Sequence, residues 1–373
     1  MSASADPRAA RVARATDLLA AHNVDALVLN PAASFAYFTG LPFHMSERPT
    51  VALLTAEGHA FVLPEMERAH LGHLPYDAAA FAYTEDVSLW PEAFSKAIGL
   101  LGLDGKRIGV EPRALRFLEL SYLQAAAPSA SFVSAEGLLA GLRMQKDATE
   151  IALMREAAQM AETALENTLP HVRAGMTERE MAGELTAQML RAGSAPALPF
   201  DPLVSFGANS ANPHASPGDY ALKPTDIILI DWGANNNHYF SDLTRVFALE
   251  PPADELQQVA EIVAAANEAG FQAARPGVAA GAIDDATRSV IADAGYGPRF
   301  LHRTGHGLGL EVHEEPYIRS GNTATLDVGM TFTIEPGIYL DGLGGIRIED
   351  DVVITADGAE RLSTLPHELR IIG

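Results

Sequence analysis

Residues 226–247 read DIILIDWGANNNHYFSDLTRVF, and this stretch carries most of the fold information in the chain. An apolar run leads into Asp231, asparagines follow, and a second apolar run begins after Asp242. Asparagine tolerates positive φ, so Asn236 and Asn237 can form a two-residue hairpin turn. A hairpin centred there places Asp231 directly opposite Asp242, with Cβ atoms roughly 5 Å apart. Two carboxylates at that separation repel each other unless a proton or a cation lies between them.

Further along, the segment TFTIEPGIYLDGLGGIRIEDDV repeats this arrangement with glutamates. Glu335 and Glu349 each end an apolar run, and Gly342 lies midway between them. A hairpin centred on Gly342 places both carboxylates on one face, although Pro336 must disturb the ladder locally. Arg347 precedes Glu349 by two residues and shares its strand face, where it can orient a carboxylate or a substrate carbonyl.

A third segment, HRTGHGLGLEVHEEP, runs from His302 to Pro316 and holds three histidines and three glycines. Glycine lets the backbone approach a ligand closely or adopt positive φ. One imidazole, such as that of His306, can bind a metal while another handles protons near neutral pH. His214, in a loop just upstream of the first block, is a fourth candidate.

Each of these residues alone has a simpler explanation. An aspartate at a strand end is most often a turn residue, a glycine-flanked histidine is most often structural, and an acidic run is most often solvated. Four carboxylates and one imidazole on apolar strands are harder to explain in this way, because unpaired buried charge is costly. The joint pattern predicts a metal site whose ligands are Asp231, Asp242, His306, Glu335 and Glu349.

The composition restricts both the chemistry and the partners. The 48 acidic and 26 basic residues leave a net charge of -22, so nucleic acid and membrane partners are not expected. The absence of cysteine excludes disulfides, thiolate zinc sites and cysteine nucleophiles. Any metal must therefore be held by oxygen and imidazole, which suits manganese, cobalt or zinc. No transmembrane segment is expected, and the cytoplasm is the default location.

The 373 residues exceed what one hydrophobic core usually serves, so two domains are expected. Residues 1–140 read as an α/β domain of alternating helices and strands, in which the run ending at Gly40 is expected to be a strand. Residues 141–373 read as a second domain, in which Asp147 is a plausible N-cap and Thr177 begins a capping box. The chain as a whole is predicted to be α+β.

The three blocks resemble those of the pita-bread metallopeptidases, the family of methionine aminopeptidase, prolidase and aminopeptidase P. The resemblance covers the chain from about residue 147 onward. The first 140 residues resemble the creatinase-type N-terminal domain, which points to the proline-specific branch of the family. The resemblance implies a pita-bread catalytic domain, two divalent metal ions, small peptide substrates and a homodimer. The metal is usually manganese or cobalt and sometimes zinc, and manganese is the first expectation here.

The same resemblance implies roles for single residues in metal-assisted peptide hydrolysis. Glu335 takes a proton from the attacking water, in addition to its role as a ligand. His313 and His214 stabilise the tetrahedral intermediate and help pass the proton to the leaving proline nitrogen. The residues expected to line the substrate site are His214, His302, His313, Tyr317, Arg347 and Phe206.

Position 317 bears on the choice between two activities. In archaeal-type prolidases an arginine four residues after the shuttle histidine holds the free carboxylate of a dipeptide, and this chain has Tyr317 there. Arg319 is two residues further on and need not point the same way. The sequence therefore favours an Xaa-Pro aminopeptidase (aminopeptidase P), unless the N-terminal domain or a partner subunit supplies the charge. The alternative is an Xaa-Pro dipeptidase (prolidase), and a remote alternative is a catalytically inactive peptide-binding module.

Overall fold

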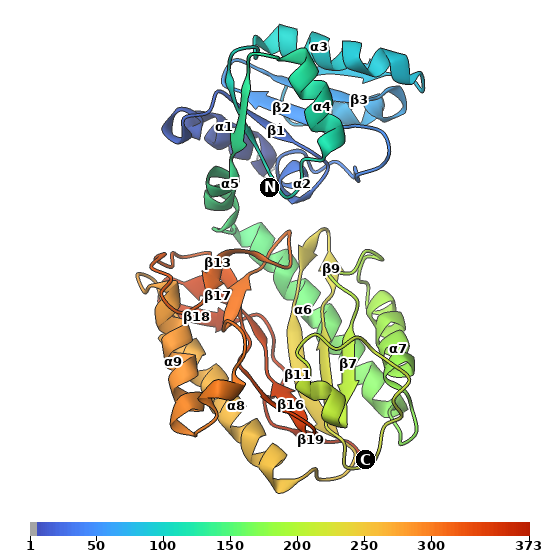
Figure 1. Cartoon of the computed structure of the whole chain (residues 1–373), viewed down its shortest axis with the longest axis vertical. Helices are drawn as coiled ribbons and strands as arrows, with labels where there is room; N and C mark the ends of the chain where they lie inside the picture. Colours follow the sequence, from blue (N-terminus) through green and yellow to red (C-terminus); the bar gives the residue numbers. More distant parts are fainter. Residues whose placement is uncertain (1–5) are drawn as a thin grey trace, which may run out of the picture. The chain divides into compact units, whose positions relative to one another are not determined.

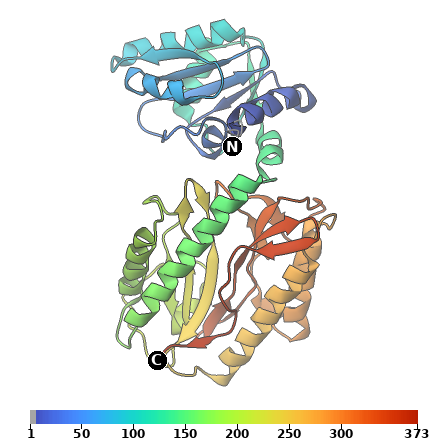
Figure 2. The same cartoon turned by 180° about the vertical axis from the view of Figure 1, so that it is seen from behind.

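The computed structural model describes residues 6–373 as two compact units that divide between Arg143 and Met144. Each unit has its own sheets and its own helices (Figures 1 and 2). This mixture of helices and strands confirms the predicted α+β class. None of the helices in the described part of the chain is long and apolar enough to cross a membrane.

The first unit is built on a six-stranded mixed sheet with the strand order β4-β3-β2-β1-β5-β6. Its strands are β1 (Ala26–Leu29), β2 (Val51–Thr55), β3 (His59–Pro64), β4 (Ala79–Tyr83), β5 (Arg107–Val110) and β6 (Ser131–Ser134). Its helices are α1 (Pro7–Leu18), α2 (Ala33–Thr39), α3 (Trp90–Leu101), α4 (Phe117–Ala126) and α5 (Glu136–Arg143), with short 3-10 segments at Ala20–His22, Glu65–His73 and Val87–Leu89. Phe94 of α3 and Leu123 of α4 share one buried core with the strands β1, β2, β3 and β5.

The segment before Gly40 is helical, so the strand expected there is wrong. Its aromatic residues favour a strand locally, but Phe35, Tyr37 and Phe38 are buried on a short helix, α2. Gly40 has φ 60° and its N–H donates to the carbonyl of Ala36, which ends the helix in a left-handed cap. Tertiary packing therefore determined the conformation. Gly40 indicates that an element ends there, but it does not indicate whether that element is a helix or a strand.

The second unit combines four helices with several small sheets. Its helices are α6 (Ala148–Thr168), α7 (Glu178–Arg191), α8 (Asp254–Ala273) and α9 (Ala280–Asp293), with 3-10 segments at Leu169–His171, Gly207–Ala211 and Gly297–Arg299. The strands up to α8 are β7 (Leu203–Phe206), β8 (Ile228–Trp232), β9 (Asn235–Asn236), β10 (Tyr239–Phe240) and β11 (Leu243–Ala248). The later strands are β12 (Gly305–Gly307), β13 (Glu314–Ile318), β14 (Thr331–Ile334), β15 (Gly337–Leu340), β16 (Gly344–Arg347), β17 (Asp350–Thr355), β18 (Gly358–Arg361) and β19 (Arg370–Ile371).

The helices of this unit lie on two flanks with the strands between them (Figures 1 and 2). Alternate residues of β8 face the two flanks, as the period of a strand requires. Ile228 and Ile230 belong to a core shared with α6 and α7. Leu229 belongs to a core shared with α8 and the strands β15 and β16. Asp231 has the parity of Leu229, so its carboxylate is directed into the space enclosed by the strands.

Sequence capping signals position the two helices α6 and α7. Asp147 caps α6 and Thr177 caps α7, each with the reciprocal glutamate of a capping box, which confirms both predictions.

Replacing Thr177 by alanine is expected to lower the free energy of unfolding by about 1 kcal/mol, because the N–H of Glu180 loses its acceptor. Chemical denaturation measures this change. Thr186→Ala, inside the same helix, is the matched control, and equal stability of the two variants would contradict the capping account.

Candidate metal centre

The two aspartates lie on one hairpin, but its register differs from the expected one. Asp231 of β8 lies opposite Thr244 of β11, and Asp242 lies two residues before Thr244 on the same side. The turn falls at Asn237 and His238, with φ 50° and 70°, one residue later than expected. The direct pairing of the two aspartates is therefore wrong. They are diagonal neighbours on one face of the hairpin.

The two glutamates have the register expected from the sequence. Ile334 of β14 pairs with Asp350 of β17, and the β15–β16 ladder continues the same register around Gly342. Gly342 has φ 76°, as a tight turn requires. Glu335 and Glu349 stand opposite each other where the two ladders meet, and this prediction is confirmed.

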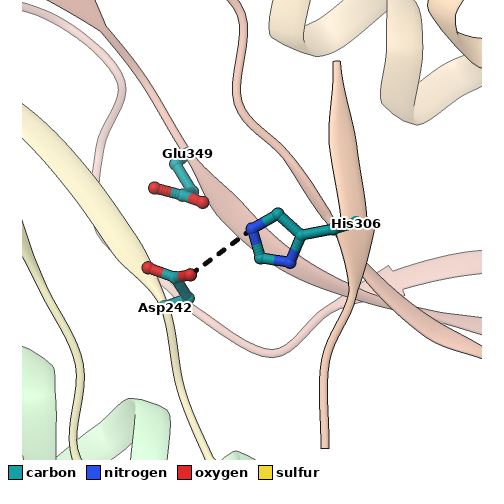
Figure 3. A group of neighbouring side chains, drawn as sticks. All are labelled: Asp242, His306 and Glu349. Atoms are coloured by element: carbon teal, nitrogen blue, oxygen red, sulfur yellow. Dashed lines mark ion pairs between the residues drawn. The ribbon is translucent and has the colours of Figure 1, made fainter. Parts of the chain in front are cut away.

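Main-chain contacts join these hairpins and bring the acids to one imidazole. An isolated antiparallel bridge pairs Thr244 with Glu349, which links the aspartate hairpin to the glutamate hairpin. His306 enters from β12, and its Nε2 lies 3.7 Å from Oδ2 of Asp242 and 3.3 Å from Oε1 of Glu335. One ligand atom each from Asp242, His306 and Glu349 lies within 4.8 Å of the others (Figure 3). Acids from both hairpins therefore lie close to the imidazole of His306.

Hydrogen bonds with neighbouring groups orient the side chains of His306 and Glu349 for metal binding. Nδ1 of His306 lies 3.2 Å from the carbonyl oxygen of Gly307, which identifies Nδ1 as the protonated nitrogen and leaves the Nε2 lone pair for a metal. Oγ1 of Thr244 donates to Oε2 of Glu349 at 2.6 Å. These contacts fix the tautomer of the imidazole and the rotation of the carboxylate.

Arg347 is buried and orients the remaining aspartate. Its Nη2 donates to Oδ2 of Asp231 at 2.5 Å, and its Nε donates to Oγ1 of Thr244 at 3.1 Å. Its Nη1 donates to the phenol oxygen of Tyr339 at 3.1 Å. All three nitrogens of the guanidinium therefore donate hydrogen bonds. The carboxylate that Arg347 contacts is that of Asp231.

His302 is a neutral ring with both nitrogens occupied. Its Nε2 lies 2.8 Å from the phenol oxygen of Tyr339, and its Nδ1 lies 2.8 Å from the carbonyl oxygen of Arg303. Because the phenol oxygen already accepts from Arg347, its own proton goes to Nε2 of His302, and Nδ1–H donates to the carbonyl. Burial, with a smaller contribution from Arg347, lowers the pKa of His302 to about 4. This histidine shapes the site and has no free proton to give.

The four carboxylates are buried together, which makes them costly as bare anions. Burial raises the pKa of Asp231, and burial together with the neighbouring acids raises the pKa of Asp242 and Glu349 well above the usual range. Burial also raises the pKa of Glu335 to about 7. Within residues 6–373, buried Oδ1 of Asp231 has no hydrogen-bond partner. An acid cluster that favours added positive charge and retains an unused oxygen fits a divalent cation.

A cavity of about 800 Å³ opens onto this cluster, within the usual size range of small-molecule sites. All five expected ligands line it, together with His214, His302 and His313. The ring of His313 stands edge-on to that of His306 with centroids 4.3 Å apart. Burial, followed by the charge of Arg303, lowers the pKa of His313. His214 is exposed at the rim and approaches from a different loop.

Two of the residues expected to line the substrate cavity lie outside its wall. The apolar residues that do line it were not predicted from the sequence. Phe206 is fully buried in the core beside α6 and α7 and does not reach the cavity. Tyr317 does not line the cavity either, but its ring lies beneath the guanidinium of Arg303, 4.5 Å from the ring centroid. The apolar part of the wall includes Phe200, Leu203 and Val312. Leu203 has the opposite strand parity to Phe206, so alternation along β7 explains the exchange.

Comparisons with known proteins cover nearly the whole chain. Residues 152–356 match metallopeptidase family M24, and residues 11–145 match the creatinase/prolidase N-terminal domain. A putative dipeptidase of Bacillus subtilis (strain 168) is 36% identical over 337 residues, which are 90% of this chain and 92% of that protein.

Solved structures with both kinds of name resemble the chain. The prolidase of Thermococcus sibiricus is 31% identical with a TM-score of 0.92, covering 99% of this chain and 100% of that one. The X-Pro aminopeptidase of Thermotoga maritima MSB8 is also 31% identical, with a TM-score of 0.84 and coverage of 96% and 99%. Overall similarity therefore does not separate dipeptidases from aminopeptidases.

Proposed function

Because the chain belongs to metallopeptidase family M24, we propose that it is an exopeptidase that uses two divalent metal ions to remove the N-terminal residue from peptides with proline in second position. The family match bears out the expected architecture, a creatinase-type N-terminal domain followed by a pita-bread catalytic domain. The observation that carries the proposal is that four carboxylates and one imidazole line one cavity, with Asp242, His306 and Glu349 buried.

The proposed metal ligands are Asp231, Asp242, His306, Glu335 and Glu349. Manganese is the proposed metal, with cobalt or zinc as alternatives, because the donors are carboxylates and imidazole without any thiolate. A pair of divalent ions held by these residues would supply a water molecule of lowered pKa and would polarise the scissile carbonyl. The four carboxylates provide the negative charge that would balance two divalent ions.

The chain's own residues then carry the proton and the developing charge. Glu335 lies at the cavity wall and is proposed to accept the proton of the attacking water. His313 and His214, which reach the cavity from two different loops, are proposed to stabilise the oxyanion and protonate the leaving nitrogen. A proline nitrogen has no hydrogen of its own in the peptide, so it requires such a donor when it leaves.

The apolar wall supports a preference for proline. Phe200, Leu203 and Val312 line the same cavity as the ligands and offer carbon surface to a compact ring. The size of the substrate is a finer question. Tyr317 carries no charge, which favours an aminopeptidase, whereas relatives named dipeptidase and prolidase fit at least as well. The homodimer and the cytoplasmic location stay predictions.

The proposed function predicts metal-dependent hydrolysis with a strict requirement for proline. With added manganese, the full chain is expected to cleave Ala-Pro or Ala-Pro-Ala and to leave Ala-Ala intact. EDTA is expected to abolish this hydrolysis and excess manganese to restore it. A discontinuous assay for released alanine measures the rates. Undiminished hydrolysis in EDTA, or equal cleavage of Ala-Ala, would contradict the proposal.

A further inference from the structure

Two arginines line the cavity, and they differ in what they contact. The guanidinium of Arg347 is committed to Asp231, Thr244 and Tyr339. Across the described residues, no hydrogen bond or ion pair engages the guanidinium of Arg303. Of the two arginines, Arg303 is therefore the one whose guanidinium has no hydrogen-bonding or ionic partner among the described residues. It is half-buried at the cavity wall, although so long a side chain could have extended into solvent.

Aromatic stacking fixes Arg303 in this position. Its guanidinium carbon lies 4.5 Å from the ring centroid of Tyr317. The main chain of Tyr317 is itself held on both sides, because its N–H donates to Glu315 and its carbonyl accepts from Asn322. A guanidinium that stacks on a ring uses its flat face and keeps its N–H fork, which lies in the plane, free for a carboxylate.

The position suits an anion immediately beyond the scissile bond. In an Xaa-Pro dipeptide the free carboxylate belongs to the residue after that bond, and consecutive Cα atoms are only about 3.8 Å apart. The partner of the carboxylate must therefore belong to the cavity wall itself. Arg303 lines the same cavity as His313 and Glu335, so its guanidinium belongs to the wall of the reacting region.

We propose that Arg303, held by the ring of Tyr317, binds the free C-terminal carboxylate of the substrate and makes dipeptides the preferred substrates. The inference rests on the proposed function. Tyr317 lacks the charge that an arginine at its own position would supply, but it supports an arginine that comes from fourteen residues earlier in the chain. Arg303 is thus a specificity-determining residue of the substrate site.

Substrates that differ only in their C-terminal charge test this inference. The manganese-loaded full chain is assayed with Ala-Pro, with its amide Ala-Pro-NH₂ and with Ala-Pro-Ala. A charge-assisted hydrogen-bond pair predicts that the wild-type chain prefers the dipeptide over the amide by about 10- to 100-fold in kcat/KM. Arg303→Met is expected to reduce this preference to about onefold, mainly by raising KM for the dipeptide.

Matched variants separate the carboxylate contact from general damage. Arg319→Met makes the same charge change at an exposed arginine whose guanidinium, among the described residues, bonds only the carbonyl of Ser320, and it is expected to keep the wild-type preference. Arg303→Lys keeps a charge without a planar fork and is expected to restore part of the preference. Tyr317→Phe keeps the ring and is expected to retain the preference, whereas Tyr317→Ala is expected to reduce it.

Product binding provides a readout that does not depend on turnover. Calorimetry on the manganese-loaded chain is expected to show tighter binding of proline than of prolinamide, with no such difference in Arg303→Met. If the wild-type chain does not discriminate between the dipeptide and the amide, or if Arg303→Met keeps the wild-type preference, the inference is overturned and the proposed function stands. If the wild-type chain cleaves none of the three substrates, the proposed function itself fails.

Discussion

Asp242→Asn is expected to lower kcat/KM by about a thousandfold or more, because the metal pair supplies several kcal/mol of transition-state stabilisation. Asparagine keeps the shape of the side chain and removes one of the four carboxylates that line the cavity with His306. The variant is also expected to bind less manganese. Steady-state kinetics at saturating manganese, together with the metal content after dialysis, measure both effects.

The Tm of the metal-free Asp242→Asn variant is expected to rise, whereas a simple folding defect would lower it. Burial, followed by the charges of Glu349 and Asp231, raises the pKa of Asp242 well above its usual range. The metal-free protein therefore loses stability as pH rises toward neutrality, and removal of this acid is expected to raise the Tm of the metal-free variant. In contrast, the Tm gain on adding manganese is expected to shrink, since a ligand that binds only the folded state stabilises it less when it binds more weakly.

An exposed aspartate serves as the control for the same chemical change. The side chain of Asp341 is 90% exposed at the tip of the β15–β16 hairpin, and within residues 6–373 it pairs only with Arg299. Asp341→Asn is expected to retain wild-type kinetics and the wild-type response to manganese. Normal turnover by Asp242→Asn with added manganese would disprove the metal assignment.

His313→Ala is expected to lower kcat by about 10²- to 10³-fold while the metal content stays at the wild-type level. His313 lines the cavity, stands edge-on to His306 and is absent from the proposed ligand set. Its loss therefore removes a proton donor and a charge-stabilising group without opening the metal site. Kinetics and metal analysis on the same preparation measure the two quantities together.

The histidine control lies outside the cavity. His171 is exposed, and its ring pairs only with Glu184 in the described part of the chain, so His171→Ala is expected to behave as the wild-type chain. A fully active His313→Ala would remove this residue from the mechanism. A variant that lost its metal would instead identify His313 as a ligand or as a support for one.

The glutamate hairpin could be predicted from sequence because its signals are local. One glycine with positive φ fixes the centre, and the period of the strand fixes which residues face each other. The aspartate hairpin shows the limit of the same reasoning. Three consecutive asparagines offered several turns, and the chain uses Asn237 with His238, a histidine at positive φ that no simple pattern predicts. The register moved, yet both aspartates kept the same face.

Features that depend on contacts between segments far apart in the sequence could not be predicted from it. The helix before Gly40 was missed because its burial, and not its aromatic propensity, determines its conformation. Phe206 was favoured over Leu203 because the sequence does not reveal which face of β7 meets the cavity. The stacking of Arg303 on Tyr317 requires β12 to pair with β13, and no spacing rule marks that pair.

The number of metal ions per chain tests the central claim most directly. The full chain, saturated with manganese and then dialysed, is analysed for metal by mass spectrometry against protein concentration. Five ligands that include four carboxylates predict about two ions per wild-type chain and a clear reduction in Asp242→Asn. A wild-type chain that retains one ion or fewer at full occupancy would contradict the two-metal account.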